Sequence, residues 1–151
     1  MRQVTLVDFP LRVARRAQQH RESLLREFAI IASHGGERAD LPKRLCELVQ
    51  LHQERYSGQN PDAEAFIEAA IARGDEFVDI VVRVPETVRG DTQALVPVLL
   101  EAVEYCRTGD LLTLEPDAEI TAYWTWFLGQ FVLQLNAEPP SSWLDFEWPN
   151  A

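Results

Sequence analysis

The sequence predicts a helix-rich α+β domain with about five helices and two or three short strands; an all-α bundle is the alternative. Hydrophobic residues recur at steps of three and four along most of the chain, which is the spacing of a helix face. Between residues 77 and 84 the spacing changes to two, as in a half-buried strand. Residues 4–7 form a second short β-prone run, and we expect these two runs to pair.

Length and composition predict a single domain. The chain has 151 residues, of which 46% are hydrophobic and 25% charged, and these are globular values. A chain of this length can bury a sizeable core without disulfides or metals. We therefore treat residues 1–151 as one globular domain with an aromatic C-terminal tail at residues 139–151.

Helix start and stop signals divide the first half of the chain. Three helices are expected there, over residues 11–33, 40–56 and 61–73. Asp40 is a good N-cap for the second helix, while Asn60 followed by Pro61 starts the third and Gly74 ends it. We expect the third helix to turn four hydrophobic residues inward: Phe66, Ile67, Ala70 and Ile71.

Two more helices and a short β-prone run at residues 111–114 are expected in the second half. Asp91 can cap a helix that runs to residue 107, in which Pro97 should cause a kink or delay the start. The aromatic helix at residues 116–136 is expected to nucleate the core, and we interpret Gly129 as a notch where another element approaches. Its predicted inner face consists of Ile120, Trp124, Phe127, Leu128, Phe131 and Leu135.

The charge and the cysteines limit the classes of partner. The formal net charge of −10 argues against general nucleic-acid binding and against an anionic membrane surface. No stretch reaches the roughly 20 apolar residues of a membrane span, and no signal peptide is recognised. Two cysteines, Cys46 and Cys106, are too few for a disulfide framework, so we expect a soluble cytoplasmic protein with reduced thiols.

No catalytic or nucleotide-binding motif is found, so we expect neither an enzyme nor a bound cofactor. His20 and His52 lie on the inner faces of adjacent helices, but a metal site needs several converging ligands, and none is expected. An apolar pocket beside the aromatic helix is the remaining small-molecule site. Its candidate lining residues are His20, His52, Trp124, Phe127 and Phe131.

Two surfaces are candidates for binding another protein. Arg12, Arg15 and Arg16 on the first long helix form a basic face in a chain whose residues 56–151 are strongly acidic. The tail carries three aromatic residues, Trp143, Phe146 and Trp148. They either fold back over the core or remain exposed as an anchor for a partner.

Three stretches resemble a known group of proteins: QQHRESLLREF at residues 18–28, YCRTGDLLTL at 105–114 and WFLGQFVLQLNAEPPSSW at 126–143. They resemble small actinobacterial proteins associated with partner-switching regulators, in which anti-sigma kinases, anti-anti-sigma proteins and SpoIIE-type phosphatases act together. The resemblance implies a regulatory neighbourhood and no particular reaction.

These observations favour a non-enzymatic regulatory or adaptor protein that acts through protein contacts, and the resemblance implies that it acts in a sigma-factor partner-switching pathway. The alternative is a small-molecule sensor whose apolar pocket is lined by the aromatic helix at residues 116–136.

Overall fold

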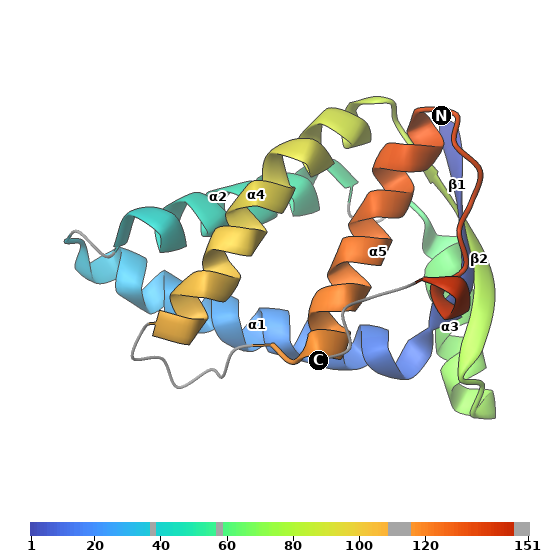
Figure 1. Ribbon diagram of the computed structural model, residues 1–151, viewed down its shortest axis with the longest axis horizontal. Helices are drawn as coiled ribbons and strands as arrows, with labels where there is room; N and C mark the ends of the chain where they lie inside the picture. The colour runs from blue at the N-terminus through green and yellow to red at the C-terminus, as the bar shows by residue number, and fades with distance from the viewer. Residues whose placement is uncertain (37–38, 57–58, 109–115, 147–151) are drawn as a thin grey trace.

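The computed structural model is a helix-rich α+β fold, as the sequence predicts (Figure 1). It describes residues 1–36, 39–56, 59–108 and 116–146. In this part of the chain, five α-helices accompany a two-stranded antiparallel sheet. The elements follow in the order β1 (Arg2–Pro10), α1 (Leu11–His34), α2 (Asp40–Tyr56), α3 (Pro61–Arg73), β2 (Phe77–Val84), α4 (Thr87–Thr108), α5 (Ala118–Leu135) and the 3-10 turn η2 (Trp143–Asp145).

The sheet pairs the two runs that the sequence predicts as partners. β1 and β2 are antiparallel, with Val4 opposite Val82 and Leu6 opposite Ile80. The register shifts between Leu6 and Phe9 at a bulge, where Asp8 has a positive φ of 55°. The predicted β-prone run at residues 111–114 lies outside the described residues.

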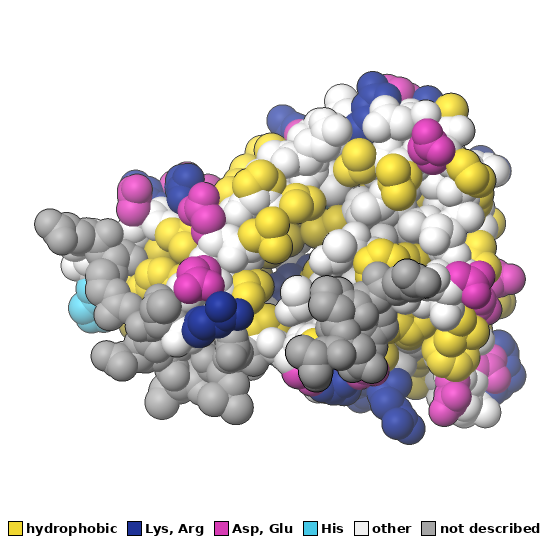
Figure 2. Space-filling model, in the orientation of Figure 1, with side chains coloured by type: hydrophobic (Ala, Val, Ile, Leu, Met, Phe, Trp, Pro, Cys, Tyr) yellow, Lys and Arg dark blue, Asp and Glu magenta, His cyan; other side chains and the backbone are white. Residues whose placement is uncertain are grey.

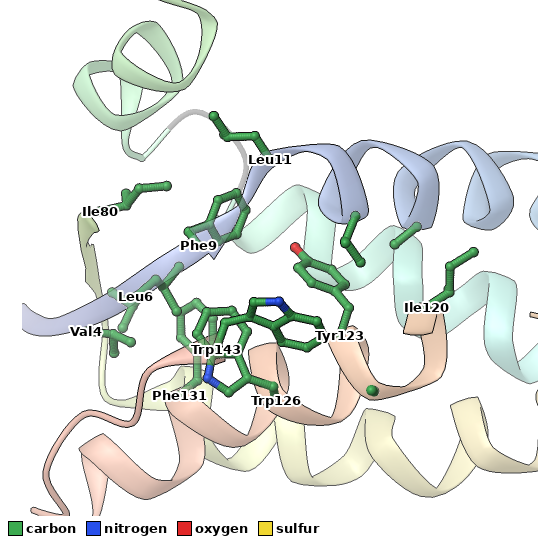
Figure 3. Packing of buried hydrophobic residues seen from close by; sticks show 14 of the residues in the cluster. Val4, Leu6, Phe9, Leu11, Ile80, Ile120, Tyr123, Trp126, Phe131 and Trp143 are labelled. Atoms are coloured by element: carbon green, nitrogen blue, oxygen red, sulfur yellow. The ribbon is translucent and has the colours of Figure 1, made fainter. Parts of the chain in front are cut away.

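Buried side chains form two separate clusters that share α1. The sheet-side cluster combines β1 and β2 with α5, the start of α1, Ala70 of α3 and Trp143 of η2 (Figure 3). The bundle-side cluster combines the second half of α1 with α2 and α4, and its buried residues include Phe28 and Leu45. Between Ala17 of the first cluster and Leu24 of the second, α1 carries the half-buried polar residues His20 and Arg21.

The aromatic helix α5 is central to the core, but its buried face is wider than predicted. Trp126 is 1% exposed and Tyr123 is also buried, although neither belongs to the predicted inner face. Trp124 and Phe127 are half-buried. The helix has the sheet and η2 on one side and α1 and α4 on others, so residues around most of its circumference lose solvent (Figure 1).

A chain of side-chain carboxamides joins α5 to the sheet and to the segment that follows the helix. Gln134 accepts a hydrogen bond from the Thr5 backbone N–H at 2.8 Å and donates to the Thr5 carbonyl at 2.8 Å. It also donates to Gln130 Oε1 at 2.9 Å, and that oxygen accepts the Ser141 backbone N–H at 3.0 Å. The Trp126 indole N–H donates to the Ser141 carbonyl at 2.8 Å. Gln134 thus satisfies the free edge of β1 at Thr5 as a further strand would.

The start of α4 differs from the prediction. The helix begins at Thr87, and Asp91 lies inside it, where it pairs with Arg55 of α2 at 2.7 Å. Asp91 is therefore not the N-cap. Pro97 sits within the helix at an exposed position, where water can satisfy the carbonyl that its missing N–H leaves unpaired.

Two packing predictions are wrong. In α3, Phe66 is 45% exposed and Ile71 is 40% exposed, whereas Ala70 is buried. This short helix covers the sheet with a narrow stripe, so the residues that flank it remain in solvent. Gly129 is not a notch, because a Cβ at that position would meet no atom within 4 Å.

Candidate functional site

The exposed side of α1 carries a line of arginines, which we call the basic stripe: Arg12, Arg15 and Arg26. At about 100° of turn per residue, these positions fall within roughly 60° of the helix circumference. All three residues are exposed. Arg26 contacts Ser23 at 3.3 Å, one turn away on the same helix.

Arg12 and Arg15 have no hydrogen bond or ion pair with any residue that the structure describes. Many arginines elsewhere do pair. Carboxylates within the chain engage Arg2, Arg44, Arg55, Arg73, Arg89 and Arg107. The exposed Glu22 lies on the same side of α1, close to Arg15 and Arg26. In a chain with a formal charge of −10, the unpaired positive charge of the stripe is therefore concentrated at Arg12 and Arg15.

Arg16, which the sequence groups with Arg12 and Arg15, has a structural role. Its guanidinium pairs with Asp117 and with Glu119 at the start of α5. Asp117 is also the N-cap of α5, accepting the Ile120 backbone N–H at 2.9 Å. This hydrogen bond and the Arg16 guanidinium lower the pKa of the Asp117 carboxyl. Arg16 thus fixes α5 against α1 and is not part of the basic stripe.

The described part of the aromatic tail folds back onto the core. Trp143 is 7% exposed, and its ring lies 5.8 Å from the Trp126 ring, centroid to centroid. Phe146 stacks on Trp143 at 6.2 Å and is half-buried. Trp148 lies outside the described residues. Trp143 cannot reach a partner in this fold without first leaving the sheet-side cluster.

The predicted pocket residues are divided between different parts of the fold. The Phe127 ring contacts two of the other predicted pocket residues. Its centroid lies 6.0 Å from that of Trp124 and 5.1 Å from that of Phe131. These three rings fill space within the sheet-side cluster. His20 is half-buried on α1, and His52 is half-buried on α2, where its environment includes Asp91 of α4. Burial lowers the pKa of His52, and the Asp91 carboxylate opposes that effect.

Arg21 of α1 is half-buried and turns toward Trp124 of α5. Its guanidinium carbon lies 5.9 Å from the centroid of the Trp124 ring, within cation–π range. Its Nε is buried and makes no hydrogen bond. No carboxylate among the described residues pairs with it.

The remaining chemistry of the described residues is sparse. Cys106 is buried. At Cys46, burial raises the pKa of the thiol, and the neighbouring Glu47 carboxylate raises it further. A raised pKa disfavours the nucleophilic thiolate form of Cys46. In the described ranges no three His, Cys, Asp or Glu side chains come together as a metal site would require. None of the helices described there combines the length and the apolar character needed to cross a membrane.

No family model, curated protein or solved structure matches this chain. The functional argument therefore rests on the helix-rich α+β fold and its side chains.

Proposed function

We propose that this chain is a non-enzymatic regulatory protein that docks an acidic surface of another protein through the basic stripe. The supporting observation is the pair Arg12 and Arg15, which are exposed and uncompensated within the described residues. Intramolecular ion pairing accounts for Arg16 but leaves these two charges without a structural role. Charge of this kind chiefly raises the rate of association with an oppositely charged partner.

The resemblance of three stretches to proteins of partner-switching systems supplies the first candidate partners. These are the anti-sigma kinases and anti-anti-sigma proteins of the host. A partner suited to the stripe should present carboxylates over roughly 20 Å, because Arg12 and Arg26 are 14 residues apart on a helix that rises about 1.5 Å per residue.

The test is a matched pair of double charge reversals. Arg12→Glu with Arg15→Glu reverses the two unpaired charges of the stripe, and Lys43→Glu with Arg83→Glu reverses two positive charges at exposed positions on α2 and β2. Each double variant changes the net charge by four. Partners are captured from the host, identified by mass spectrometry, purified and then titrated against all three proteins.

We expect the stripe variant to weaken binding at least tenfold with an almost unchanged melting temperature, while the control binds as the wild type does. Binding should also weaken between 50 mM and 500 mM salt, since exposed charges are screened over about 10 Å at 0.1 M. Equal weakening by both double variants, or binding that is insensitive to salt, would reject the stripe as the docking surface.

A further inference from the structure

The face of the molecule in Figure 2 is hollowed between α4 and α5. These two helices lie side by side near the start of α4 and the end of α5, and they diverge toward α1, which passes behind them (Figure 1). Hydrophobic side chains line the α4 side of the hollow, and atoms of a basic side chain show at its floor. The hollow lies where the sheet-side and bundle-side clusters separate, so neither cluster fills it.

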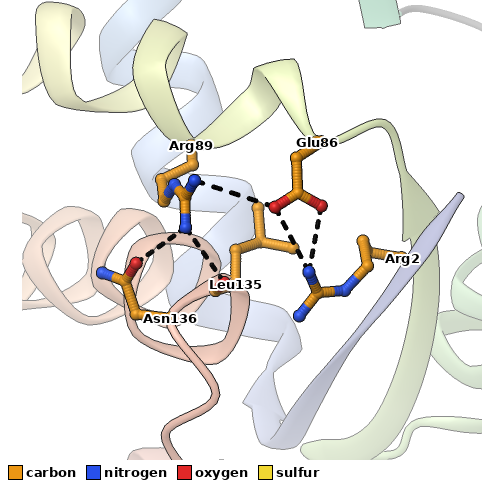
Figure 4. A network of polar contacts seen from close by, with 5 residues as sticks. All are labelled: Arg2, Glu86, Arg89, Leu135 and Asn136. Carbon is orange, nitrogen blue, oxygen red and sulfur yellow. Dashed lines mark hydrogen bonds and ion pairs between the residues drawn. The ribbon is translucent and has the colours of Figure 1, made fainter.

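The α4 wall of the hollow can be assigned from helix geometry. Arg89 reaches the end of α5, where it donates to the Leu135 carbonyl at 3.2 Å and to Asn136 Oδ1 at 2.8 Å (Figure 4). Val96 and Val103 follow Arg89 at steps of seven and therefore lie on the same side of α4. Leu100, four residues after Val96, extends this apolar side and is 58% exposed.

Arg21 is half-buried on α1 between the two clusters, so we assign the cation at the floor of the hollow to this residue. Arg21 of α1 lies over the ring of Trp124 of α5, with its Nε buried and without a hydrogen bond. A guanidinium presents donors in a planar fork that matches a carboxylate, phosphate or sulfonate. The Trp124 face stabilises the cation but accepts none of its in-plane N–H groups.

We infer that the hollow between α4 and α5 is a binding site for an amphiphilic organic anion, with an apolar body along Val96, Leu100 and Val103 and an anionic group on Arg21. The ligand's apolar body would remove only a few aliphatic side chains of α4 from water, which by itself gives modest affinity. A charge-assisted hydrogen bond from the Arg21 guanidinium to the ligand's anionic group adds affinity and fixes the ligand's orientation. This site uses the inner side of α1, whereas the basic stripe uses the outer side. The two proposals can therefore succeed or fail separately.

The test uses dodecanoate as the probe, with dodecanol as the uncharged analogue and inorganic phosphate as the anion without an apolar body. Binding to the full chain is measured by calorimetry below the micelle concentration. We expect saturable binding of one dodecanoate, and no binding of phosphate or dodecanol at the same concentrations. Arg21→Gln should weaken dodecanoate binding about tenfold or more. Arg83→Gln removes the same charge from an exposed site on β2 and should leave binding unchanged.

A second pair of variants tests the apolar wall with little risk to folding. Leu100→Asp places a carboxylate beside the hollow and should abolish dodecanoate binding. Leu144→Asp makes the same change at a leucine of η2 that is 59% exposed and should have no effect. Near-ultraviolet circular dichroism confirms that each variant keeps its tertiary packing. The inference is overturned if dodecanoate does not bind saturably, if dodecanol binds equally well, or if each control weakens binding as much as its partner variant.

Discussion

Replacing Gln134 by glutamate should destabilise the fold although the two side chains have nearly the same shape. In the wild type the Gln134 amide nitrogen donates to the Thr5 carbonyl at 2.8 Å and to Gln130 Oε1 at 2.9 Å. An ionised carboxylate at this position could still accept the Thr5 N–H, but it would have no proton to donate. It would instead place a negatively charged oxygen against two oxygen acceptors in a partly buried site.

The cost can be worked out from the hydrogen bonds that are lost. Two part-buried hydrogen bonds contribute about 0.5–1.5 kcal/mol each, and leaving an acceptor unsatisfied raises the cost. We therefore expect Gln134→Glu to lower the free energy of unfolding by about 2–4 kcal/mol. For a domain of this size, a loss of about 3 kcal/mol lowers the melting temperature by about 6–12 °C.

Urea denaturation followed by tryptophan fluorescence at pH 8 measures this loss. Gln93→Glu is the matched control, because Gln93 is exposed on α4 and gains the same charge. In the Gln134→Glu protein the introduced carboxyl should titrate above the ordinary glutamate pKa of about 4.3, since its surroundings favour the protonated form. The folded state then binds the proton more tightly than the unfolded state, so the penalty should shrink from pH 8 to pH 5. A Gln134→Glu protein within about 0.5 kcal/mol of the control at pH 8 would refute the role given to this carboxamide.

Three further outcomes follow from burial and capping. Trp126→Ala should cost about 3–5 kcal/mol of unfolding free energy, and Trp124→Ala less than half of that, as measured by urea denaturation; equal losses would contradict the assigned burial. The pKa of His52 is lowered in the folded state, so the unfolded state binds more protons below pH 6.5 and stability should fall as the pH drops from 7.5 to 5.5. This fall should be smaller in His52→Gln. If the pH dependence of stability is the same in His52→Gln as in the wild type, the role assigned to His52 is wrong. Asp117→Ala removes the N-cap of α5 and should cost about 0.5–2 kcal/mol, so a melting temperature equal to that of the wild type would rule out the cap.

Local signals predict much of the fold because they describe short stretches of backbone. The change of period at residues 77–84 locates β2. Asn60 with Pro61 and then Gly74 give both ends of α3, and Gly74 adopts the left-handed conformation that this position favours, with φ of 82°. The sequence offers few strand-like runs besides residues 4–7 and 77–84, so these two are predicted to pair as β1 and β2.

The buried side of an element is harder to predict when it has several neighbours. A single helical stripe describes a helix that packs against one surface, and it omits Trp126 and Tyr123 because α5 packs against several. The same assumption gives α3 too wide an inner face, since a two-stranded sheet can cover only part of it. Hydrophobicity along the chain does not show how many neighbours a helix has.

The arginines of α1 show where sequence reasoning stops for the candidate sites. Arg12, Arg15, Arg16 and Arg21 are equally cationic in the sequence, but the fold gives them different environments. Arg16 faces Asp117 and Glu119, which are about a hundred positions away along the chain, whereas Arg12 and Arg15 face solvent. Arg21 lies between the two core clusters. Its environment depends on the divergence of α4 from α5, which is a feature of the tertiary fold (Figure 1). Each cluster covers only part of the 24 residues of α1. The helix can therefore place an inward-facing cation, Arg21, between the clusters and keep charged residues on its outer side.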